Sequence, residues 1–564
     1  MAGILVIDTH PGAAEAHAVS KKLVDRLSGS GEACSRISEP CADYRETFET
    51  AQADTLVYFP PVDPRQGSLD FSEAEDVFGA ASRAGILHVV AISSAEIYGP
   101  RPHNIGFLPE TRPRTYSGKN AVAGQWIAFE ECAERLLDPV RLTLLRPAPM
   151  LVPGGDGYFR RLFWGRVAAT LPRYDPSLQL LCPEDFVQAI CLVVEKRPGG
   201  IYNVAPDGVI PLKKALRLAR TLRVPVPKGL HAAGREIVQG LDRTGPVDQV
   251  DYIRYAWTVS NRKVKQDLGF EPGRSSVEAL AAFLAEKPGG PALSADEAAG
   301  LTFDDYGMDK SYVAAYGRTL VKFLRHVYWR IEHTGLEHIP RQGRAVLTGV
   351  HRGFMPLDAV MTFHLLVAEI GRHPRFLIHP TLIKFPFQFN FMTKLGGMIA
   401  CQENANYVLG RDELLGIYPE GINGAFIYYR DAYRLGRFGR DEYVKMALRN
   451  RAPLVPFVTV GTPEIFPVFG KLNWRWWKRF TLWPCFPIAP PFPLLPVPLP
   501  TKWHIQFLPP VHLEEQYPPE AADDPAVVKA ISRDVKGRMQ AAIDEMLERR
   551  KHIFYGSIFE EATA

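Results

Sequence analysis

The sequence predicts the α/β fold class, with two domains, the first of which holds a doubly wound parallel sheet. Short apolar runs alternate with segments of helical spacing, as in parallel β-α-β units. Hydrophobic residues make up 46% and charged residues 23% of the 564 residues, as in folded globular chains. A Pro/Gly-rich stretch that begins at Lys287 indicates a linker between two halves. We therefore expect a first domain at 1–288, a linker at 289–305 and a second domain at 306–564.

The first domain opens with an apolar run and continues by strand–helix alternation. Continuous apolar runs predict buried strands, and helical spacing of apolar residues predicts the helices between them. The strands are expected at 4–7, 55–59, 88–92 and 141–145, and the helices include 14–27 and 72–84. Sequential β-α-β units place helices on both faces of one sheet, which gives the doubly wound arrangement.

Charge and cysteine content exclude several classes of function. The net charge of +4 arises from 66 basic and 62 acidic residues, which is too balanced to indicate a nucleic-acid partner. Seven scattered cysteines without a C-x-x-C pair favour a reducing compartment and argue against a disulfide framework or a zinc site. The first eight residues lack a basic n-region, so no signal peptide is expected.

Two segments bear on membrane contact. Trp483–Pro500 is eighteen uncharged residues long, but eight of them are proline, so a spanning helix is not expected. Lys310–Arg330 holds five basic and no acidic residues among apolar ones at helical spacing, which predicts a basic amphipathic helix for an anionic membrane surface. The alternative is a helix that packs on its own domain and exposes a solvated basic face.

A third segment, Asn473–Phe480, interleaves three tryptophans with three basic residues. This mixture suits the headgroup layer of a bilayer. It would also suit RNA stacking, but no RNA-binding module accompanies it. The phenylalanines between Phe385 and Phe391 alternate with polar residues, which indicates a half-buried strand or an irregular segment. We expect a peripheral protein at the cytoplasmic, inner face of a membrane.

Five motifs of the first half match one enzyme family. They are His88–Pro100, Leu144–Gly154, Cys182–Ile190, Gly199–Gly208 and Ser260–Pro272. Over 3–285 the chain resembles the extended short-chain dehydrogenase/reductases, the NAD-dependent epimerase/dehydratase type. The resemblance implies a Rossmann-like NAD(P)-binding domain in which Ser94 matches the family serine.

The glycine loop that would hold the dinucleotide is degenerate. Only Gly12 remains of the glycines that let a backbone approach a pyrophosphate, and it stands one place off the family spacing. Pro11 lacks an N–H, and Asp8 would place a negative charge near the pyrophosphate. No obvious acidic residue follows the second strand. NAD(P) binding is therefore doubtful, with Gly12 and Ser94 as its candidate residues.

The catalytic Tyr-x-x-x-Lys pair of that family is not recognisable. Alignment on Glu130 places Val122 and Trp126 at the two positions, and neither side chain can exchange a proton. Tyr116 and Lys119 are spaced one residue too closely, and an alignment that uses Tyr116 would restore redox activity. The first domain either supports the second, binds a nucleotide-like ligand, or retains epimerase or dehydrogenase activity.

The second half brings a histidine and two carboxylates to strand ends. An apolar run at 346–350 delivers His351 to a turn, and Asp358 follows near the start of a helix. A carboxylate on one ring nitrogen would fix the tautomer of a histidine that accepts a hydroxyl proton. The alternative is that Asp358 caps the helix and that His351 is an ordinary surface histidine.

A second apolar run ends in Pro419, Glu420 and Gly421, followed by Asn423. N–H groups beside Gly421 would suit an oxyanion or phosphate, although an ordinary strand-to-helix turn has the same sequence character. A third apolar run at 452–461 predicts another buried strand. Parallel strands carry their polar ends to one edge of a sheet, so these residues should converge.

This order of motifs resembles the glycerolipid and lysophospholipid acyltransferases over 310–552. The resemblance implies that His351 is the general base, that Asp358 orients it, and that no metal or cofactor is required. It implies an acyl-CoA or acyl carrier protein donor and a lipid acceptor such as a lysophospholipid, glycerol phosphate or diacylglycerol. Its candidate substrate-binding residues are Arg352, Pro419, Glu420, Gly421 and Asn423.

Two departures from that family bear on the acceptor. Six residues separate His351 from Asp358, as in the diacylglycerol acyltransferase-related branch, and 395–406 lacks the arginine that holds glycerol phosphate. The missing arginine weakens a phosphorylated acceptor and leaves neutral or unusual alcohols open. Arg352 could compensate, as could three arginines at helical spacing, for which a solvated helix face is the alternative: Arg430, Arg434 and Arg437. A scaffold without enzymatic activity is a further alternative for the whole chain.

Overall fold

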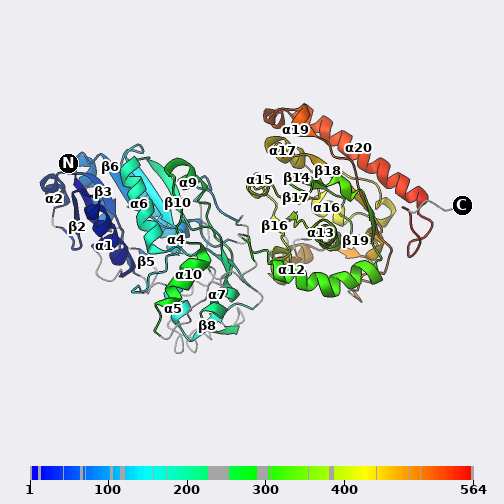
Figure 1. The fold of residues 1–564 in the computed structure, drawn as a ribbon, viewed down its shortest axis with the longest axis horizontal. Helices are drawn as coiled ribbons and strands as arrows, with labels where there is room; N and C mark the ends of the chain where they lie inside the picture. Colours follow the sequence, from blue (N-terminus) through cyan, green and yellow to red (C-terminus); the bar gives the residue numbers. More distant parts are fainter. Residues whose placement is uncertain are drawn as a thin grey trace. The chain divides into compact units, whose positions relative to one another are not determined.

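A computed structural model describes residues 3–559 apart from several short stretches. The stretches left out are 10–13, 42, 64–67, 70–71, 102–103, 105, 115–120, 156–157, 173, 226–251, 253, 289–302, 305, 354, 380–385, 440, 482 and 496. The chain divides into two compact units, Met1–Gly307 and Met308–Ala564 (Figure 1). Most of the expected linker at 289–305 lies outside the described residues.

The N-terminal unit is built on a six-stranded parallel sheet in the order β10-β7-β6-β3-β1-β2. Its strands are β1 (Gly3–Ile7), β2 (Cys34–Ile37), β3 (Ala53–Tyr58), β6 (His88–Ile92), β7 (Leu142–Pro147) and β10 (Gly200–Val204). The central strands are buried along almost their whole length, which explains their continuous apolar runs. The α/β prediction and the parallel sheet are confirmed, with strand ends within two residues of those expected.

Helices cover this sheet in two groups. α1 (Ala14–Gly29) packs beside α6 (Pro183–Lys196). α2 (Tyr44–Ala51), α3 (Ser72–Arg83) and α4 (Ala121–Leu136) pack beside one another as the second group. β1 lies between β2 and β3, so the strand order reverses there, where open α/β sheets bind ligands. Among the described residues the sheet ends at β2, whereas the 3-2-1-4-5-6 dinucleotide order has a further strand on that side.

Smaller elements complete the N-terminal unit beside the carboxyl-terminal strands of the sheet. They are α5 (Tyr158–Trp164), β8 (Val167–Thr170), β9 (Ser177–Leu178), β11 (Ile210–Pro211), α7 (Leu212–Leu218), β12 (Leu222–Pro225), α9 (Arg262–Leu268) and α10 (Ser276–Ala285). β8 pairs with β12 and β9 pairs with β11. A capping box between Ser275 and Glu278 starts α10.

The C-terminal unit holds a seven-stranded sheet in the order β13-β21-β18-β14-β17-β15-β16. The strands are β13 (Glu332–Thr334), β14 (Ala345–Thr348), β15 (Arg375–Ile378), β16 (Met398–Ile399), β17 (Leu414–Ile417), β18 (Leu454–Val460) and β21 (His504–Phe507). β14 pairs in parallel with both β17 and β18, and β21 runs antiparallel to β18. The strands that precede His351 and Pro419 are therefore neighbours, and their polar ends meet at one edge as predicted.

Helices α13 (Leu357–Ile370), α15 (Gln402–Gly410), α17 (Glu442–Arg449) and α20 (Pro525–Arg549) surround this sheet. α20 packs against β18 and α17 packs against β14. Trp329 and Trp503 are fully buried and stack with ring centroids 4.4 Å apart. They join the start of β13 to the start of β21, because the Trp503 N–H donates to the Trp329 carbonyl.

The predicted basic helix at 310–330 forms, but it is not a simple amphipathic helix. It begins as α12 (Lys310–Tyr316) and continues through two π-helical turns, η4 (Gly317–Val321) and η5 (Leu324–Tyr328). Arg325 points inward and pairs with Glu369, whereas Leu320, Phe323 and Val327 are exposed.

The expectation of a strand or irregular segment around 385–391 was wrong. Residues Pro386–Lys394 form a helix, α14, which packs beside α12. The Phe391 ring lies 5.4 Å from the Tyr316 ring, measured between centroids. Packing of α14 on a neighbouring helix overrides the alternation of phenylalanine and polar residues, as tertiary contacts often override local pattern.

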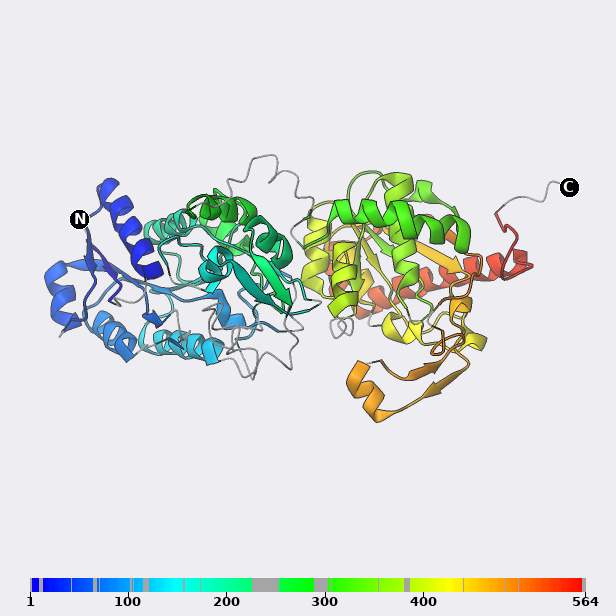
Figure 2. The same ribbon diagram turned by 90° about the horizontal axis from the view of Figure 1, so that it is seen from below.

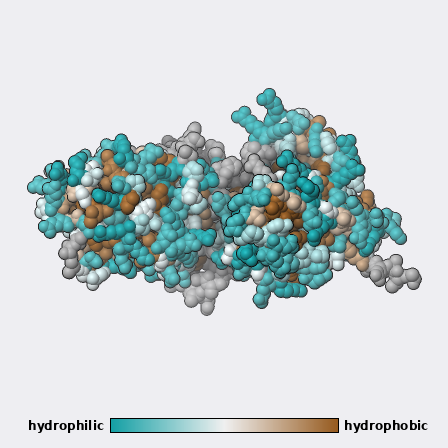
Figure 3. Space-filling view, turned by 90° about the horizontal axis from the view of Figure 1, so that it is seen from above, coloured by the Kyte–Doolittle hydropathy of each residue, from teal (hydrophilic) through white to brown (hydrophobic). Residues whose placement is uncertain are grey.

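The proline-rich run at 483–500 contains a short strand, β20 (Phe486–Ile488), followed by turns. Across the described residues, no helix combines the length and apolar character needed to cross a bilayer. On the face seen in Figure 3, hydrophobic residues appear in separate patches among hydrophilic ones.

Candidate active site

His351 and Asp358 form a bonded pair at the carboxyl edge of the C-terminal sheet. His351 lies three residues after β14, and Asp358 is the second residue of α13. The His351 Nδ1 and Asp358 Oδ2 atoms are 2.7 Å apart. The Asp358 carboxylate also accepts the N–H groups of Arg352 at 3.0 Å and Ala359 at 2.8 Å. With Nδ1–H donated to the carboxylate, Nε2 of the neutral ring is left to accept a proton.

The exposed fractions of the two side chains bear on the two interpretations of this pair, which are a histidine oriented by a carboxylate and a helix cap beside a surface histidine. The Asp358 side chain is 1% exposed and that of His351 is 15% exposed. A surface histidine beside a helix cap would show a mobile, solvated ring. Instead the carboxylate is fixed by three donors and the imidazole is mostly buried, which favours the interpretation of His351 as a positioned proton acceptor.

Arg352 and Glu420 form a second buried pair beside the first. Arg352 donates through Nη1 to Glu420 Oε2 at 2.5 Å and through Nη2 to Oε1 at 3.2 Å. Nη1 also donates to the His351 carbonyl at 2.8 Å. The side chains are 1% and 3% exposed. The pair therefore ties the turn after β14 to the turn after β17.

The segment Ala432–Gly436 closes over this pair. The Ala432 carbonyl accepts from Arg352 Nε at 2.6 Å and the Arg434 carbonyl accepts from Nη2 at 3.2 Å. The Gly436 N–H donates to Glu420 Oε1 at 2.7 Å. All three guanidinium nitrogens of Arg352 thus have partners inside the protein. The prediction that Arg352 binds a phosphate is not supported by this placement, because every donor nitrogen already points to a buried acceptor.

α16 (Gly421–Ala425) follows Glu420 and presents the other predicted residues. Gly421 has a φ of +56°, and a Cβ built there would meet nothing within 4 Å, so open space adjoins it. Its N–H donates to the Tyr418 carbonyl at 2.9 Å and is not free for an oxyanion, contrary to expectation. Pro419 is half-buried and Asn423 is exposed. Gly424 is needed because a Cβ there would lie 2.7 Å from Glu420 Cβ.

Tyr418 is a site residue that sequence reasoning missed. Its ring centroid lies 5.3 Å from that of His351. Burial, together with the nearby Asp358 carboxylate, raises the pKa of Tyr418 well above its ordinary value, so the hydroxyl stays neutral. Its position directly before Pro419 at the end of a predicted strand was the available signal.

The predicted arginine stripe does not form a helix face. Arg430 lies in the short 3₁₀ turn Tyr429–Asp431, and the residues after it are turns and extended chain. Arg434 and Arg437 are exposed on either side of Gly436. The 432–436 backbone is used instead to hold Arg352 and Glu420, which explains why the helical spacing is not realised.

Ser94, Val122 and Trp126 of the N-terminal unit lie among the described residues. Ser94 accepts the Glu96 N–H and caps a short 3₁₀ turn. Val122 and Trp126 are buried on α4, and Trp126 Nε1 donates to the Glu96 carboxylate at 3.3 Å. Burial raises the pKa of Glu96 to about 7. The alternative pair, Tyr116 and Lys119, lies outside the described residues, as does Gly12.

At the end of β1 the Asp8 carboxylate is buried and bound by Arg36, through Nε at 3.0 Å and Nη2 at 2.7 Å. An exposed acidic residue, Glu39, does follow β2, so the statement that none does was wrong. The sequence analysis did not locate the end of the second strand, so Glu39 was not recognised as the acidic residue that follows it. Among the described residues, Asp8 places a buried carboxylate at the end of β1, and Val122 and Trp126 are buried side chains that cannot exchange a proton.

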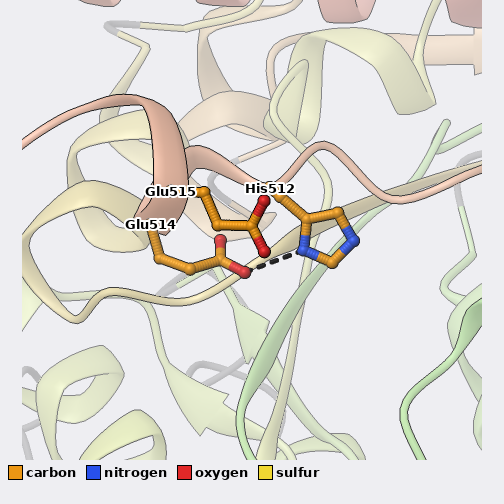
Figure 4. A group of neighbouring side chains, drawn as sticks. All are labelled: His512, Glu514 and Glu515. Atoms are coloured by element: carbon orange, nitrogen blue, oxygen red, sulfur yellow. Dashed lines mark hydrogen bonds and ion pairs between the residues drawn. The ribbon is translucent and has the colours of Figure 1, made fainter.

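One group of possible metal ligands lies on the surface among the described residues. His512, Glu514 and Glu515 bring donor atoms within 4.8 Å of one another (Figure 4). His512 Nδ1 and Glu514 Oε1 are 2.8 Å apart, which is an ordinary exposed ion pair. Its two glutamates lie on α19 (Leu513–Gln516), a helix of four residues, and His512 directly precedes that helix.

Comparison with known proteins agrees with this geometry. Residues 330–460, which include both pairs, match the family described as Acyltransferase. The uncharacterized protein Rv0502 of Mycobacterium tuberculosis is 34% identical over 289 residues, which is 50% of this chain and 76% of that protein. Residues 330–460 therefore form an acyltransferase domain, and the chain belongs to the same family as the mycobacterial protein, to which it is related over most of that protein's length.

Two further relatives match with lower sequence identity, the second of them over a shorter region. The uncharacterized protein Rv0501 of Mycobacterium tuberculosis is 25% identical over 282 residues, covering 48% of this chain and 74% of that protein. Phytyl ester synthase 2 of Arabidopsis thaliana, a chloroplastic protein, is 29% identical over 147 residues, covering 24% of this chain and 20% of that protein.

Solved structures similar to part of this chain include MoeE5 in complex with UDP-glucuronic acid and NAD. It is 16% identical, with a TM-score of 0.39, over 50% of this chain and 96% of that one. The Bordetella bronchiseptica enzyme WbmG in complex with NAD and UDP is 16% identical, with a TM-score of 0.38, over 50% and 94%.

Proposed function

We propose that this acyltransferase moves an acyl group from a thioester, acyl-CoA or acyl carrier protein, to the hydroxyl of a lipid alcohol, with His351 as the general base. The observation that carries the proposal is the 2.7 Å contact between His351 Nδ1 and the buried Asp358 carboxylate. A histidine held in one tautomer, with its second nitrogen free to accept a proton, is suited to activate a hydroxyl near neutral pH.

The reaction needs no nucleophile from the protein. His351 Nε2 takes the proton of the acceptor hydroxyl as its oxygen attacks the thioester carbonyl carbon. The tetrahedral intermediate then expels the thiolate, which receives the proton from the imidazolium, so protons and charges balance. The Asp358 carboxylate stabilises the imidazolium between these two transfers. Neither a metal nor a redox cofactor takes part.

Arg352 and Glu420 act as positioning residues in this scheme. Arg352 holds the His351 carbonyl, and Glu420 holds the turn that leads into α16. Pro419, Gly421 and Asn423 then border the open space beside Gly421 and are proposed to contact the acceptor. This support fixes the relative position of base and acceptor, on which the rate of such transfers depends strongly.

The acceptor is proposed to be a neutral long-chain alcohol or diacylglycerol rather than a glycerol phosphate or lysophospholipid. Arg352, which follows His351 directly, is fully committed to internal partners, and the 395–406 block contains no arginine. The phytyl ester synthase among the relatives has a name that points to esters of a long-chain alcohol. We further propose that the N-terminal unit supports the enzyme without a redox reaction, and that the protein works at the cytoplasmic face of a membrane.

An acceptor panel tests this function. The full chain is supplied with long-chain acyl-CoA and, in separate vesicle reactions, a long-chain alcohol, diacylglycerol, lysophosphatidate or lysophosphatidylcholine, and free thiol is followed. We expect release that depends on the neutral acceptors and is lost in folded His351→Ala. Faster release with lysophosphatidate than with any neutral alcohol would reverse the acceptor assignment. Equal release by parent and His351→Ala would overturn the role of His351.

A further inference from the structure

A small lobe of the C-terminal unit projects from the rest of that unit. β19 (Gly470–Leu472) pairs antiparallel with β20, and α18 (Arg475–Thr481) lies between them in sequence. In Figure 2 these elements, drawn in orange, extend away from the sheet and helices that carry the site. We call residues 469–495 the aromatic lobe.

The aromatic lobe exposes large apolar side chains. Phe469 is 62% exposed, Trp476 is 61% exposed and Leu494 is 95% exposed. Trp474 and Ile488 are also exposed. The rings of Trp474 and Trp476 stack with centroids 5.7 Å apart, and Trp474 packs on Phe486 at 5.1 Å, so the exposed rings are held in place. Exposed apolar residues gathered in one element mark an interaction surface.

The charge of the aromatic lobe and its flanking residues indicates which kind of surface the lobe binds. Between Ile465 and Leu513 the sequence holds five lysine or arginine residues and no acidic residue. Arg475, Lys478 and Arg479 lie on α18 among the tryptophans and are exposed. Tryptophan at the headgroup level, combined with basic side chains, matches the anionic surface of a bilayer.

The base of the aromatic lobe is built onto the segment that follows α16. Trp483 packs on Phe426 with centroids 5.5 Å apart, and the Tyr429 N–H donates to the Val468 carbonyl at 2.9 Å. Lys471 lies over the Tyr428 ring at 4.1 Å. Phe426 directly follows Ala425, the last residue of α16. The aromatic lobe is therefore joined to the loop that holds Glu420 and Gly421.

We propose that the aromatic lobe docks on an anionic lipid bilayer and places the α16 loop at the membrane surface, where a lipid acceptor can enter. Tryptophans 474 and 476 would enter the headgroup layer while Arg475, Lys478 and Arg479 contact lipid phosphates. The docking proposal depends only on the exposed apolar and basic side chains of the aromatic lobe. The proposal that docking helps a lipid acceptor to enter rests on the proposed function.

Co-sedimentation of the full chain with vesicles tests docking directly. The probes are phosphatidylcholine vesicles with and without phosphatidylserine. We expect binding to the anionic vesicles that falls about tenfold or more in Arg475→Glu/Lys478→Glu and in Trp474→Ser/Trp476→Ser, and that weakens with salt. Two matched controls, Lys529→Glu/Arg533→Glu on exposed positions of α20 and Val140→Ser on an exposed position of the N-terminal unit, should bind as the parent does.

Three results would overturn docking by this lobe. They are no vesicle binding by the parent, binding by the lobe variants equal to that of the parent, and a stronger affinity of the parent for single-stranded RNA than for anionic vesicles. Thermal unfolding equal to the parent shows that each lobe variant is folded. Thiol release with a water-soluble alcohol separates the two proposals, because lobe variants should keep that activity and lose it only toward acceptors in vesicles.

Discussion

Arg352 and Glu420, which follow two neighbouring strands, are joined by two hydrogen bonds in a space from which water is almost excluded. Arg352 also holds the carbonyl of His351, and Glu420 holds the N–H of Gly436. The general base and the turn before α16 are therefore parts of one hydrogen-bonded unit. Their relative position is set by this buried pair.

Removal of one partner of this pair should destabilise the C-terminal unit strongly. Arg352→Met or Glu420→Gln leaves an uncompensated buried charge, which costs about 3–5 kcal/mol. Urea unfolding measures the loss. The matched control is Asp412→Asn, which breaks an exposed ion pair with Arg344 and should cost less than about 1 kcal/mol. Similar small losses for all three variants would show that the Arg352–Glu420 pair is not a structural link.

Asp358→Asn should leave the fold largely intact and remove most of the activity. An asparagine can present its amide N–H to Nδ1, which favours the tautomer with a proton on Nε2 and so blocks the base. We expect kcat to fall about 10³–10⁴-fold, with no further loss in the double variant with His351→Gln, since the two residues act as one unit. Steady-state kinetics on the single and double variants measure this, and additive losses would mean that the two residues act independently.

Gly349→Ala should disturb the approach to His351. A Cβ at this position would lie 2.2 Å from the Phe457 ring, so strand or ring must move. We expect a loss of about 1–3 kcal/mol in stability together with reduced kcat. Gly410→Ala is the matched control, because its Cβ would meet nothing within 4 Å and alanine favours a helix, so a gain of up to about 1 kcal/mol is expected. Equal stabilities of the two variants would refute the close packing on Gly349.

Glu96 should make the stability of the N-terminal unit depend on pH. Burial raises its pKa from 4.5 to about 7, so between these values the folded protein retains a proton that the unfolded chain has released. The stability from this group is complete below about pH 4.5 and is lost as pH rises through about 7. Glu96→Gln removes the dependence, so its unfolding temperature relative to the parent should be higher at pH 8 than at pH 5. A constant difference between the two proteins would contradict the raised pKa.

Much of the fold follows from the sequence because both sheets are largely parallel and buried. Their strands appear as continuous apolar runs, and His88–Ile92 was predicted with the limits that the structure shows. The segment 385–391 was misjudged because its phenylalanines suit either a strand or a helix that packs on α12. The local sequence pattern does not distinguish a strand from a helix here, because the outcome depends on packing against α12, about 70 residues earlier in the sequence.

The candidate site was predictable in part for the same reason. His351, Asp358 and Glu420 follow apolar runs, and parallel strands bring such residues together. The role of Arg352 was not predictable, because an arginine beside a histidine can bind a phosphate as well as an internal carboxylate. Its partners at Ala432 and Arg434 are backbone carbonyls, which leave no trace in side-chain sequence.

The central claim is that His351 is the base that activates the acceptor hydroxyl. The most direct measurement compares acceptor-dependent thiol release from acyl-CoA by the full chain and by His351→Gln, with a neutral long-chain alcohol in vesicles. The account predicts that the variant folds, binds vesicles as the parent does, and loses about 10²–10⁴ in kcat. A folded variant that keeps parental kcat would contradict the account.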